Sequence, residues 1–185
     1  MRLVVLSPFF SLFDVGKMWA FGLVLAALAL IVALKPKPLP PDGQSHPLGT
    51  APSFKERFLD EAKKVDLRGV SPLIALTIAG LETGWGSGGI FKKTNNLFNL
   101  KATSTWKGPV YPASDGGNFR VYSSWGDCMK DWAAWLEKSK IFKNAFYHAT
   151  ANRAKETFVE LQKGGYAGAD KDYAGKLQRT FDRLV

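Results

Sequence analysis

The sequence predicts a mostly helical α+β domain with one short β-hairpin, preceded by an apolar N-terminal segment. Three observations predict this class. Apolar residues recur at spacings of three and four through much of the region after residue 53. One interval in that region has the pattern of two short strands joined by an Asp-Gly turn. The 185 residues are 46% hydrophobic and 13% aromatic, which is enough for a single packed core.

The apolar N-terminal segment is predicted to be a membrane anchor. Residues 18–34, MWAFGLVLAALALIVAL, contain no charged residue and are bounded by Lys17 and Lys35. This length is at the short end for a transmembrane helix, and no small-residue cleavage site follows it directly. We expect an uncleaved anchor over residues 1–34, with its orientation left open because basic residues flank it on both sides. Residues 35–52, KPKPLPPDGQSHPLGTAP, are expected to form an extended linker.

Two helices are predicted at the start of the globular domain, residues 53–185. Ser53 and Glu56 form a capping box, and the apolar spacing that follows predicts a helix that ends around residues 66–69. A serine-proline pair then provides the cap and the N1 proline of a second helix, residues 72–83. Because that helix is apolar almost all round, we expect it to be buried at the centre of the domain.

A hairpin and further helices complete the predicted domain. Aromatic and β-branched residues flank the sequence SDGG within residues 105–122, which predicts a hairpin that turns at Asp115 and Gly116. Helices are expected after the cap Ser124, over about residues 152–163, and at the C-terminus. In the first of these, helical spacing predicts core positions for Trp125, Cys128, Met129, Trp132, Trp135 and Leu136. This layout is that of a lysozyme-like two-lobed fold, in which a cleft between the lobes holds an extended sugar chain.

Charge and rare residue types exclude some classes of protein. The formal net charge is +9, from 25 Lys and Arg against 16 Asp and Glu, and it favours a polyanionic partner: nucleic acid, anionic lipid or cell wall. No recognised nucleic-acid-binding motif is present, so no nucleic-acid partner is expected. The single cysteine, Cys128, excludes an internal disulfide. With only His46 and His148 in the sequence, we expect no metal site and no cofactor.

One carboxylic acid, Glu82, lies at the end of the apolar helix predicted over residues 72–83. It is the only acidic residue between Asp66 and Asp115, and Trp85 follows it closely. Apolar surroundings and the negative end of the helix dipole would both raise its pKa. A raised pKa is the property of a general acid, which gives its proton to a leaving glycosidic oxygen. The alternative is a structural glutamate, either solvated at the helix end or tied to backbone amides.

Five motifs in the domain resemble one known family. In order, they are LETGWG, TNNLFNLKA, TWKG, NFRVYSSW and GGYAGADKDYAGKL. Together they resemble the glucosaminidase domain of bacterial autolysins and flagellar-rod peptidoglycan hydrolases, glycoside hydrolase family 73, over essentially all of residues 53–185. The resemblance implies that Glu82 is the catalytic acid and that Tyr166 is a catalytic residue lining the cleft. It also implies a set of substrate-binding residues: Trp85, Asn95, Asn96, Phe98, Trp106 and Tyr173.

Some of these residues have structural alternatives, and the sequence departs from the family pattern at two of the matched positions. Aromatic residues such as Phe98 and Trp106 are more often part of the core than sugar platforms, and an asparagine such as Asn95 is more often a turn residue than a ligand. Asn99 occupies a position where the family usually has glycine, and Gly168 one where it usually has threonine. These departures would alter the loop or the outer sugar-binding positions.

A second carboxylate is the open part of the expected mechanism. Many family members carry a second glutamate in the β lobe, whereas this interval contains only Asp115, which the Asp-Gly turn also explains as structural. With Glu82 alone, three routes are available. The substrate's 2-acetamido group can assist, a water held by Tyr166 and asparagine side chains can attack, or the sugar's 6-hydroxyl can close a ring. The last route is lytic transglycosylase chemistry.

The sequence therefore predicts a peptidoglycan hydrolase of the endo-β-N-acetylglucosaminidase type, which cleaves β-1,4 bonds of glycan strands outside the cytoplasm. The anchor adds membrane lipid as a partner, and a larger envelope or virion assembly is a further candidate partner. Two alternatives stay open: a lytic transglycosylase or muramidase, and a non-catalytic wall-binding module on the same fold.

Overall fold

The computed structural model describes residues 53–114, 116–168 and 170–185. The predicted membrane anchor, residues 1–34, and the predicted linker, residues 35–52, lie outside the described residues. Among the helices that are described, none is both long enough and apolar enough to cross a bilayer.

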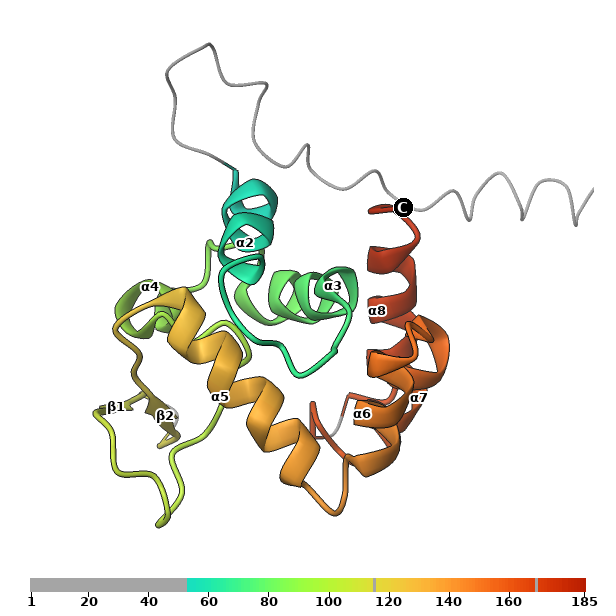
Figure 1. Ribbon diagram of the computed structural model, residues 1–185. Helices are drawn as coiled ribbons and strands as arrows, with labels where there is room; N and C mark the ends of the chain where they lie inside the picture. Colours follow the sequence, from blue (N-terminus) through green and yellow to red (C-terminus); the bar gives the residue numbers. More distant parts are fainter. Residues whose placement is uncertain (1–52, 115, 169) are drawn as a thin grey trace, which may run out of the picture. The chain divides into compact units, whose positions relative to one another are not determined.

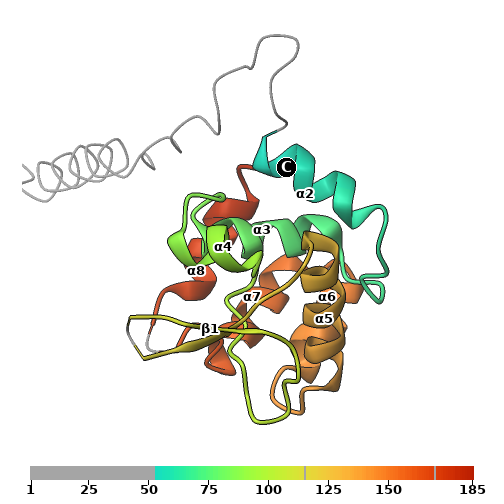
Figure 2. The same ribbon diagram turned by 90° about the vertical axis from the view of Figure 1, so that its left-hand side faces the viewer.

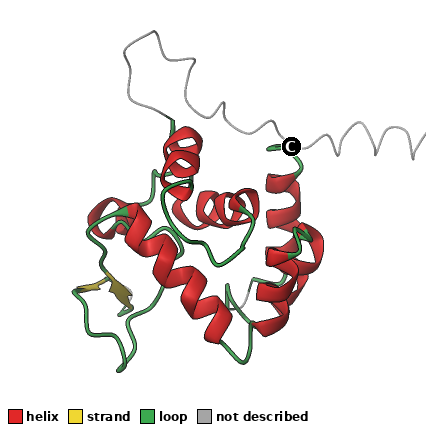
Figure 3. Ribbon diagram, viewed as in Figure 1, coloured by secondary structure: helices red, strands yellow, loops and turns green. Residues whose placement is uncertain are grey.

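Helices make up most of the described domain, and a two-stranded sheet lies at its side (Figure 1, Figure 3). In chain order the elements are α2 (Phe54–Ala62), α3 (Pro72–Thr83), α4 (Gly89–Thr94), β1 (Val110–Pro112), β2 (Asn118–Arg120), α5 (Trp125–Lys138), α6 (Lys143–Thr150), α7 (Ala154–Lys163) and α8 (Tyr173–Phe181). Helix α3 packs against α2 and α8, while α5 contacts both α2 and α6. The predicted mostly helical α+β class is confirmed.

Helix α3 is the buried centre of the domain, as its composition predicts. Proline occupies its first position, and Gly84 ends it in a left-handed conformation with φ of 55°. Ser71 precedes the helix but makes no side-chain cap hydrogen bond. Every residue from Ile74 to Gly80 is buried, so the helix contacts protein on nearly all of its surface. Both predicted ends of this helix are confirmed.

Helix α2 begins as predicted but ends earlier. The capping box between Ser53 and Glu56 is present in both directions. The helix stops at Ala62, and the prediction that it reaches residues 66–69 is wrong. The segment that follows forms turns instead, because Arg68 takes a left-handed conformation with φ of 55° and its backbone N–H is bound by the Asp66 side chain.

The predicted hairpin is present and forms the β lobe. Strands β1 and β2 pair antiparallel, with Tyr111 opposite Phe119. The turn is closed by a hydrogen bond from Ala113 N to the carbonyl of Gly117 at 2.8 Å. Figure 2 shows the hairpin on the side of the domain away from α2. Asp115, the residue predicted to be either a turn residue or a second carboxylate, lies outside the described residues.

The helices after the hairpin are partly as predicted. Ser124 caps α5 through its side chain, which accepts a hydrogen bond from Asp127 N at 3.1 Å. Cys128 and Trp132 are fully buried, as their spacing predicts. The short helices α4 and α6 are absent from the prediction, because neither has a side-chain cap hydrogen bond or a long apolar period to mark it.

Candidate active site

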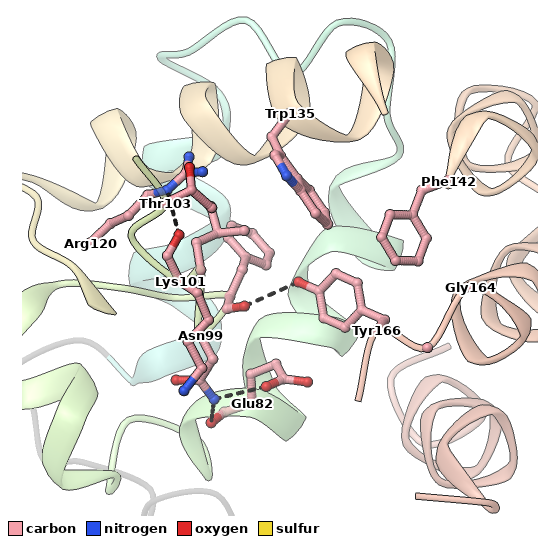
Figure 4. A pocket seen from close by; sticks show the side chains of 12 residues that line it. Glu82, Asn99, Lys101, Thr103, Arg120, Trp135, Phe142, Gly164 and Tyr166 are labelled. Atoms are coloured by element: carbon pink, nitrogen blue, oxygen red, sulfur yellow. Dashed lines mark hydrogen bonds between the residues drawn. The ribbon is translucent and has the colours of Figure 1, made fainter. Parts of the chain in front are cut away.

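A pocket of about 320 Å³ lies where segments far apart in the sequence meet (Figure 4). It is bordered by the last turn of α3, the loop after α4, the C-terminal half of α5 and the turn after α7. The residues that line it are Glu82, Phe98, Asn99, Leu100, Lys101, Thr103, Arg120, Trp135, Phe142, Gly164, Gly165 and Tyr166. The two predicted catalytic residues, Glu82 and Tyr166, are therefore in the same pocket.

Glu82 reaches this pocket because of where α3 ends. The buried part of the helix fixes its position in the core, and Gly84 stops the helix just after Glu82. The side chain is half-buried and lies in the last helical turn, at the negative end of the helix dipole. The sequence pattern of an apolar helix that ends in one acid thus places a carboxyl group at the pocket wall.

Two neutral groups hold the Glu82 carboxyl. The Tyr173 hydroxyl donates to Oε1 at 2.6 Å, and the Asn99 side-chain amide donates to Oε2 at 2.8 Å. Burial raises the pKa of Glu82 above its ordinary value, while both hydrogen bonds oppose this because they stabilise the charged form. Among the described residues, none of the ion pairs involves Glu82. The carboxyl is therefore suited to hold a proton and to release it.

Tyr166 lies across the pocket from Glu82 and helps to join its walls (Figure 4). Its hydroxyl donates to the carbonyl of Phe98 at 3.1 Å and lies 3.2 Å from Trp132 Nε1, which donates to it. Its ring stacks on that of Tyr173, with centroids 5.8 Å apart. Burial raises the pKa of the Tyr166 phenol, so the group is neutral at physiological pH.

Two predicted substrate-binding residues in the loop after α4 are almost fully buried. Phe98 is 1% exposed, and its ring stacks on Trp132 with centroids 4.1 Å apart. Asn96 is 0% exposed: its side chain donates to the carbonyls of Leu100 and Arg120, and its Oδ1 accepts from Leu100 N and from the Cys128 sulfur. Asn96 therefore holds the loop from below the pocket, whereas Phe98 both packs on Trp132 and lines the pocket. A role of either side chain in substrate binding stays a prediction.

Asn95 lies at the C-terminal end of α4, where it takes a left-handed conformation with φ of 52°. Its side-chain amide donates to the carbonyl of Tyr122 at 3.1 Å, which ties the loop to the segment after β2. The structure thus places Asn95 at a turn and not among the residues that line the pocket.

The two predicted substrate-binding tryptophans lie away from Glu82's pocket. Trp85 packs edge-on against Phe54 and covers Gly80, where an added Cβ would come within 2.9 Å of the indole ring. Trp106 lines a second hollow of about 390 Å³ with Tyr122, and its Nε1 donates to the carbonyl of Pro109.

The opposite end of the pocket carries a positively charged side chain, Arg120, which no sequence pattern predicts there. Arg120 is 7% exposed; its guanidinium donates to Asp131 Oδ2 at 2.6 Å and to the carbonyl of Lys101 at 3.0 Å. The same guanidinium lies over the ring of Trp106, 5.0 Å from its centroid.

Three further residues of the site depend on tertiary packing. Trp135 was predicted to be a core residue, yet it is partly exposed and lines the pocket, because the core face of α5 opens there. Tyr173, predicted to bind substrate, bonds to Glu82 itself. Asn99, which differs in the sequence from the family's usual glycine, donates to the Glu82 carboxyl. No group of three or more metal-ligating side chains occurs in the part of the chain that the structure describes.

Comparison with known proteins gives a family match over most of the domain. A sequence profile described as mannosyl-glycoprotein endo-beta-N-acetylglucosaminidase, of the glucosaminidase family, matches residues 56–184. The chain is 33% identical over 164 residues to the peptidoglycan hydrolase FlgJ of Salmonella typhimurium, covering 80% of this chain and 51% of that protein. It is 31% identical over 127 residues to the exo-glucosaminidase LytG of Bacillus subtilis, covering 62% and 44%. The chain spans about half the length of the curated relatives it matches.

Solved structures agree with the fold. The glycoside hydrolase domain of Salmonella typhimurium FlgJ matches with a TM-score of 0.57 and 33% identity, over 71% of this chain and 86% of that chain. A mutant peptidoglycan hydrolase from Sphingomonas sp. A1 matches with a TM-score of 0.59 and 28% identity, over 70% and 91%. The catalytic domain of the Listeria monocytogenes autolysin Auto shares the fold at 20% identity, with a TM-score of 0.53.

Proposed function

The chain belongs to the glucosaminidase family, and on this premise we propose that it is a peptidoglycan hydrolase in which Glu82 is the general acid. One observation carries the proposal: the Glu82 carboxyl lines a pocket, has no ion-pair partner among the described residues, and has its pKa raised by burial. Such a group keeps its proton to higher pH than an ordinary glutamate. The bond that it cleaves is the β-1,4 bond after N-acetylglucosamine in glycan strands.

In the proposed reaction, Glu82 gives its proton to the leaving glycosidic oxygen as the bond from that oxygen to the anomeric carbon breaks. The two donors on the carboxyl, Tyr173 and Asn99, then stabilise the carboxylate that this transfer creates. Addition of water to the anomeric carbon releases a proton, which Glu82 takes back. The same residue thus serves as acid and then as base.

The partner of Glu82 in this reaction is the substrate or water. Glu82 is the only acidic residue among the described residues that line the pocket. We therefore infer that the positive charge on the anomeric carbon is stabilised by the substrate's 2-acetamido group or removed by the addition of water. Asp115 stays a candidate second carboxylate by prediction alone. Attack by the sugar's own 6-hydroxyl would give an anhydro product, which is the lytic transglycosylase alternative.

The proposed place of action is outside the cytoplasmic membrane. The curated relatives named FlgJ are described as peptidoglycan hydrolases, which supports a cell-wall substrate. We propose that residues 18–34 anchor the chain in lipid and that residues 35–52 let the domain reach the wall, so that tethering raises its local concentration there. An envelope or virion assembly would be the natural setting for such a tether.

The experiment is clearing of insoluble peptidoglycan by the purified full chain, followed by mass spectrometry of the fragments. Wild type is expected to clear the wall and to release fragments with N-acetylglucosamine at new reducing ends. Glu82→Gln should not clear, whereas Glu137→Gln, the same change at an exposed ion pair with Arg68, should clear like wild type. Anhydro ends would assign the transglycosylase reaction. Wall binding without clearing by wild type would assign a non-catalytic module.

A further inference from the structure

The loop residue Asn99 contacts Glu82 at two points. Its side-chain Nδ2 donates to the Glu82 carboxyl Oε2 at 2.8 Å and to the Glu82 backbone carbonyl at 3.0 Å (Figure 4). An amide nitrogen carries two N–H groups, so both bonds form at once. We propose that Asn99 is a positioning residue that holds the carboxyl and the main chain of Glu82 in one geometry; its catalytic meaning rests on the proposed function above.

Holding both ends of one side chain restricts its rotation. A glutamate has flexible torsions between its backbone and its carboxyl, and fixing them costs entropy that must be met by contacts. Asn99 donates to the backbone carbonyl and to one carboxyl oxygen of Glu82. Tyr173, on α8, donates to the other carboxyl oxygen. The carboxyl is therefore held from two directions before any substrate arrives, which favours proton transfer along a fixed line.

The loop that carries Asn99 is itself rigid. Asn96 bonds to three backbone groups in and around this loop, and Leu97 N donates to the Cys128 sulfur at 3.2 Å. Phe98 is stacked on Trp132 and its carbonyl accepts the Tyr166 hydroxyl. Asn99 thus acts from a support that is tied to α5 and to the turn after α7.

Backbone conformation does not by itself explain an asparagine at this position. Asn99 has φ of 51°, in the left-handed region where glycine has no steric cost and asparagine is tolerated. Glycine would satisfy the turn at lower cost. The side chain of Asn99, with its two bonds to Glu82, is the physical reason for the difference.

The effect of the Asn99 side-chain amide on the pKa of Glu82 depends on the other charged and titratable groups nearby. Tyr173 faces it from α8 and Tyr166 from the turn after α7, and both are neutral. Lys101 and Arg120 line the same pocket from the β lobe side. The donor from Asn99 stabilises the charged carboxylate and lowers the pKa of Glu82 against the effect of burial. Loss of this donor should therefore raise the pKa of Glu82.

The matched test uses two asparagines of the same loop. Asn99→Gly and Asn95→Gly make the same change at the same backbone conformation, with φ of 51° and 52°, but only Asn99 touches Glu82. In the full chain, Asn99→Gly should lower the clearing rate at the pH optimum by about tenfold, through lost orientation. The alkaline limb of the pH–activity profile of this variant should move to higher pH, because Glu82 can act as a general acid only when it is protonated. Asn95→Gly should keep the wild-type limb.

A second variant and a substrate-free readout complete the test. Asn99→Asp keeps the size and the tolerated φ but puts a carboxylate against Glu82, so its alkaline limb should lie above that of Asn99→Gly. Carbon-13 NMR titration of the Glu82 carboxyl should give the same order without any turnover: wild type lowest, then Gly, then Asp. Equal midpoints in all three would overturn the proposal. Ordered midpoints in a chain that clears no wall would uphold it and reject the proposed hydrolase.

Discussion

The carboxylates near the two ends of the pocket have different kinds of hydrogen-bond donor. At one end, Glu82 is held by two neutral donors, Tyr173 and Asn99, and forms no ion pair with any described residue. At the other end, the lining residue Arg120 donates to Asp131 at 2.6 Å, and the Tyr122 hydroxyl donates to the same carboxylate at 2.7 Å; Asp131 itself does not line the pocket.

The difference shows how the partners of a carboxylate decide its role in the protein. The Arg120–Asp131 ion pair joins β2 to α5. Neutral donors hold a carboxyl in place with a smaller effect on its charge, so burial still raises the pKa of Glu82. The Arg120 end is therefore structural, while the Glu82 end is suited to proton transfer. Substitutions made at one end at a time should therefore separate effects on activity from effects on stability.

The largest effect is expected from removing the proton at the Glu82 end. Glu82→Gln keeps the shape of the side chain but cannot give a proton, so turnover of glycan strands should fall about 10²–10⁴-fold. Its fold should persist, because a glutamine amide can still accept one bond and donate another at this site. The rate of clearing and the circular dichroism melt of the same preparation measure the two quantities. A variant that stays active would contradict the assignment.

Breaking the opposite end should change stability instead. Asp131→Asn removes the charge that neutralises Arg120, whose side chain is 9% exposed against 31% for Asp131. We expect the free energy of unfolding to fall by about 1–3 kcal/mol, less than for a fully buried pair. Urea unfolding measures this change. Activity per folded molecule should stay within a few-fold of wild type, and a loss as large as that of Glu82→Gln would show that the two ends are not separate.

A smaller effect is expected from the second donor on Glu82. Tyr173→Phe removes the hydroxyl that donates to Oε1, so the pKa of Glu82 should rise and the alkaline limb of the pH–activity profile should move upward. The rate at the optimum should fall about tenfold, because the carboxyl is then held only by Asn99. Tyr147→Phe, at an exposed tyrosine of α6, is the matched control and should leave the profile unchanged. A profile unmoved in both variants would rule out this role for Tyr173.

The smallest effect is a pH dependence of stability. Because the pKa of Glu82 is higher in the folded chain than its ordinary value of 4.5, its contribution to stability is complete below that value. The contribution is lost as the pH rises through the folded-state pKa. Glu82→Gln does not titrate at this position, so its melting temperature should rise relative to that of wild type as the pH increases above 4.5. Melting curves that run parallel over this range would mean that the pKa is not raised.

What the sequence could predict follows from local patterns. The ends of α3, the Ser124 cap of α5 and the hairpin depend on residues close together in the chain, so proline, serine and glycine signals were sufficient. The position of Glu82 at a pocket follows from the same helix end. The family resemblance is confirmed by the profile match over residues 56–184.

What the sequence could not predict depends on contacts between distant segments. The bond from Tyr173 to Glu82 joins residues 91 positions apart, and it exists because α8 packs against α3. A motif also does not say where each of its side chains lies: in NNLFNL, Asn96 is buried below the pocket, and Phe98 packs in the core and lines the pocket. Asn99, which departs from the family's glycine, contacts Glu82. Tertiary packing makes these choices.

The most direct test of the role proposed for Glu82 is the titration of its carboxyl group in the wild-type full chain. Carbon-13 labelling of glutamate, with the Glu82 resonance identified by its absence from Glu82→Gln, gives the midpoint without any assumption about substrate. We predict a midpoint above the ordinary value of 4.5. A midpoint at or below that value would mean that Glu82 is ionised in the resting protein, and it would contradict its assignment as the general acid.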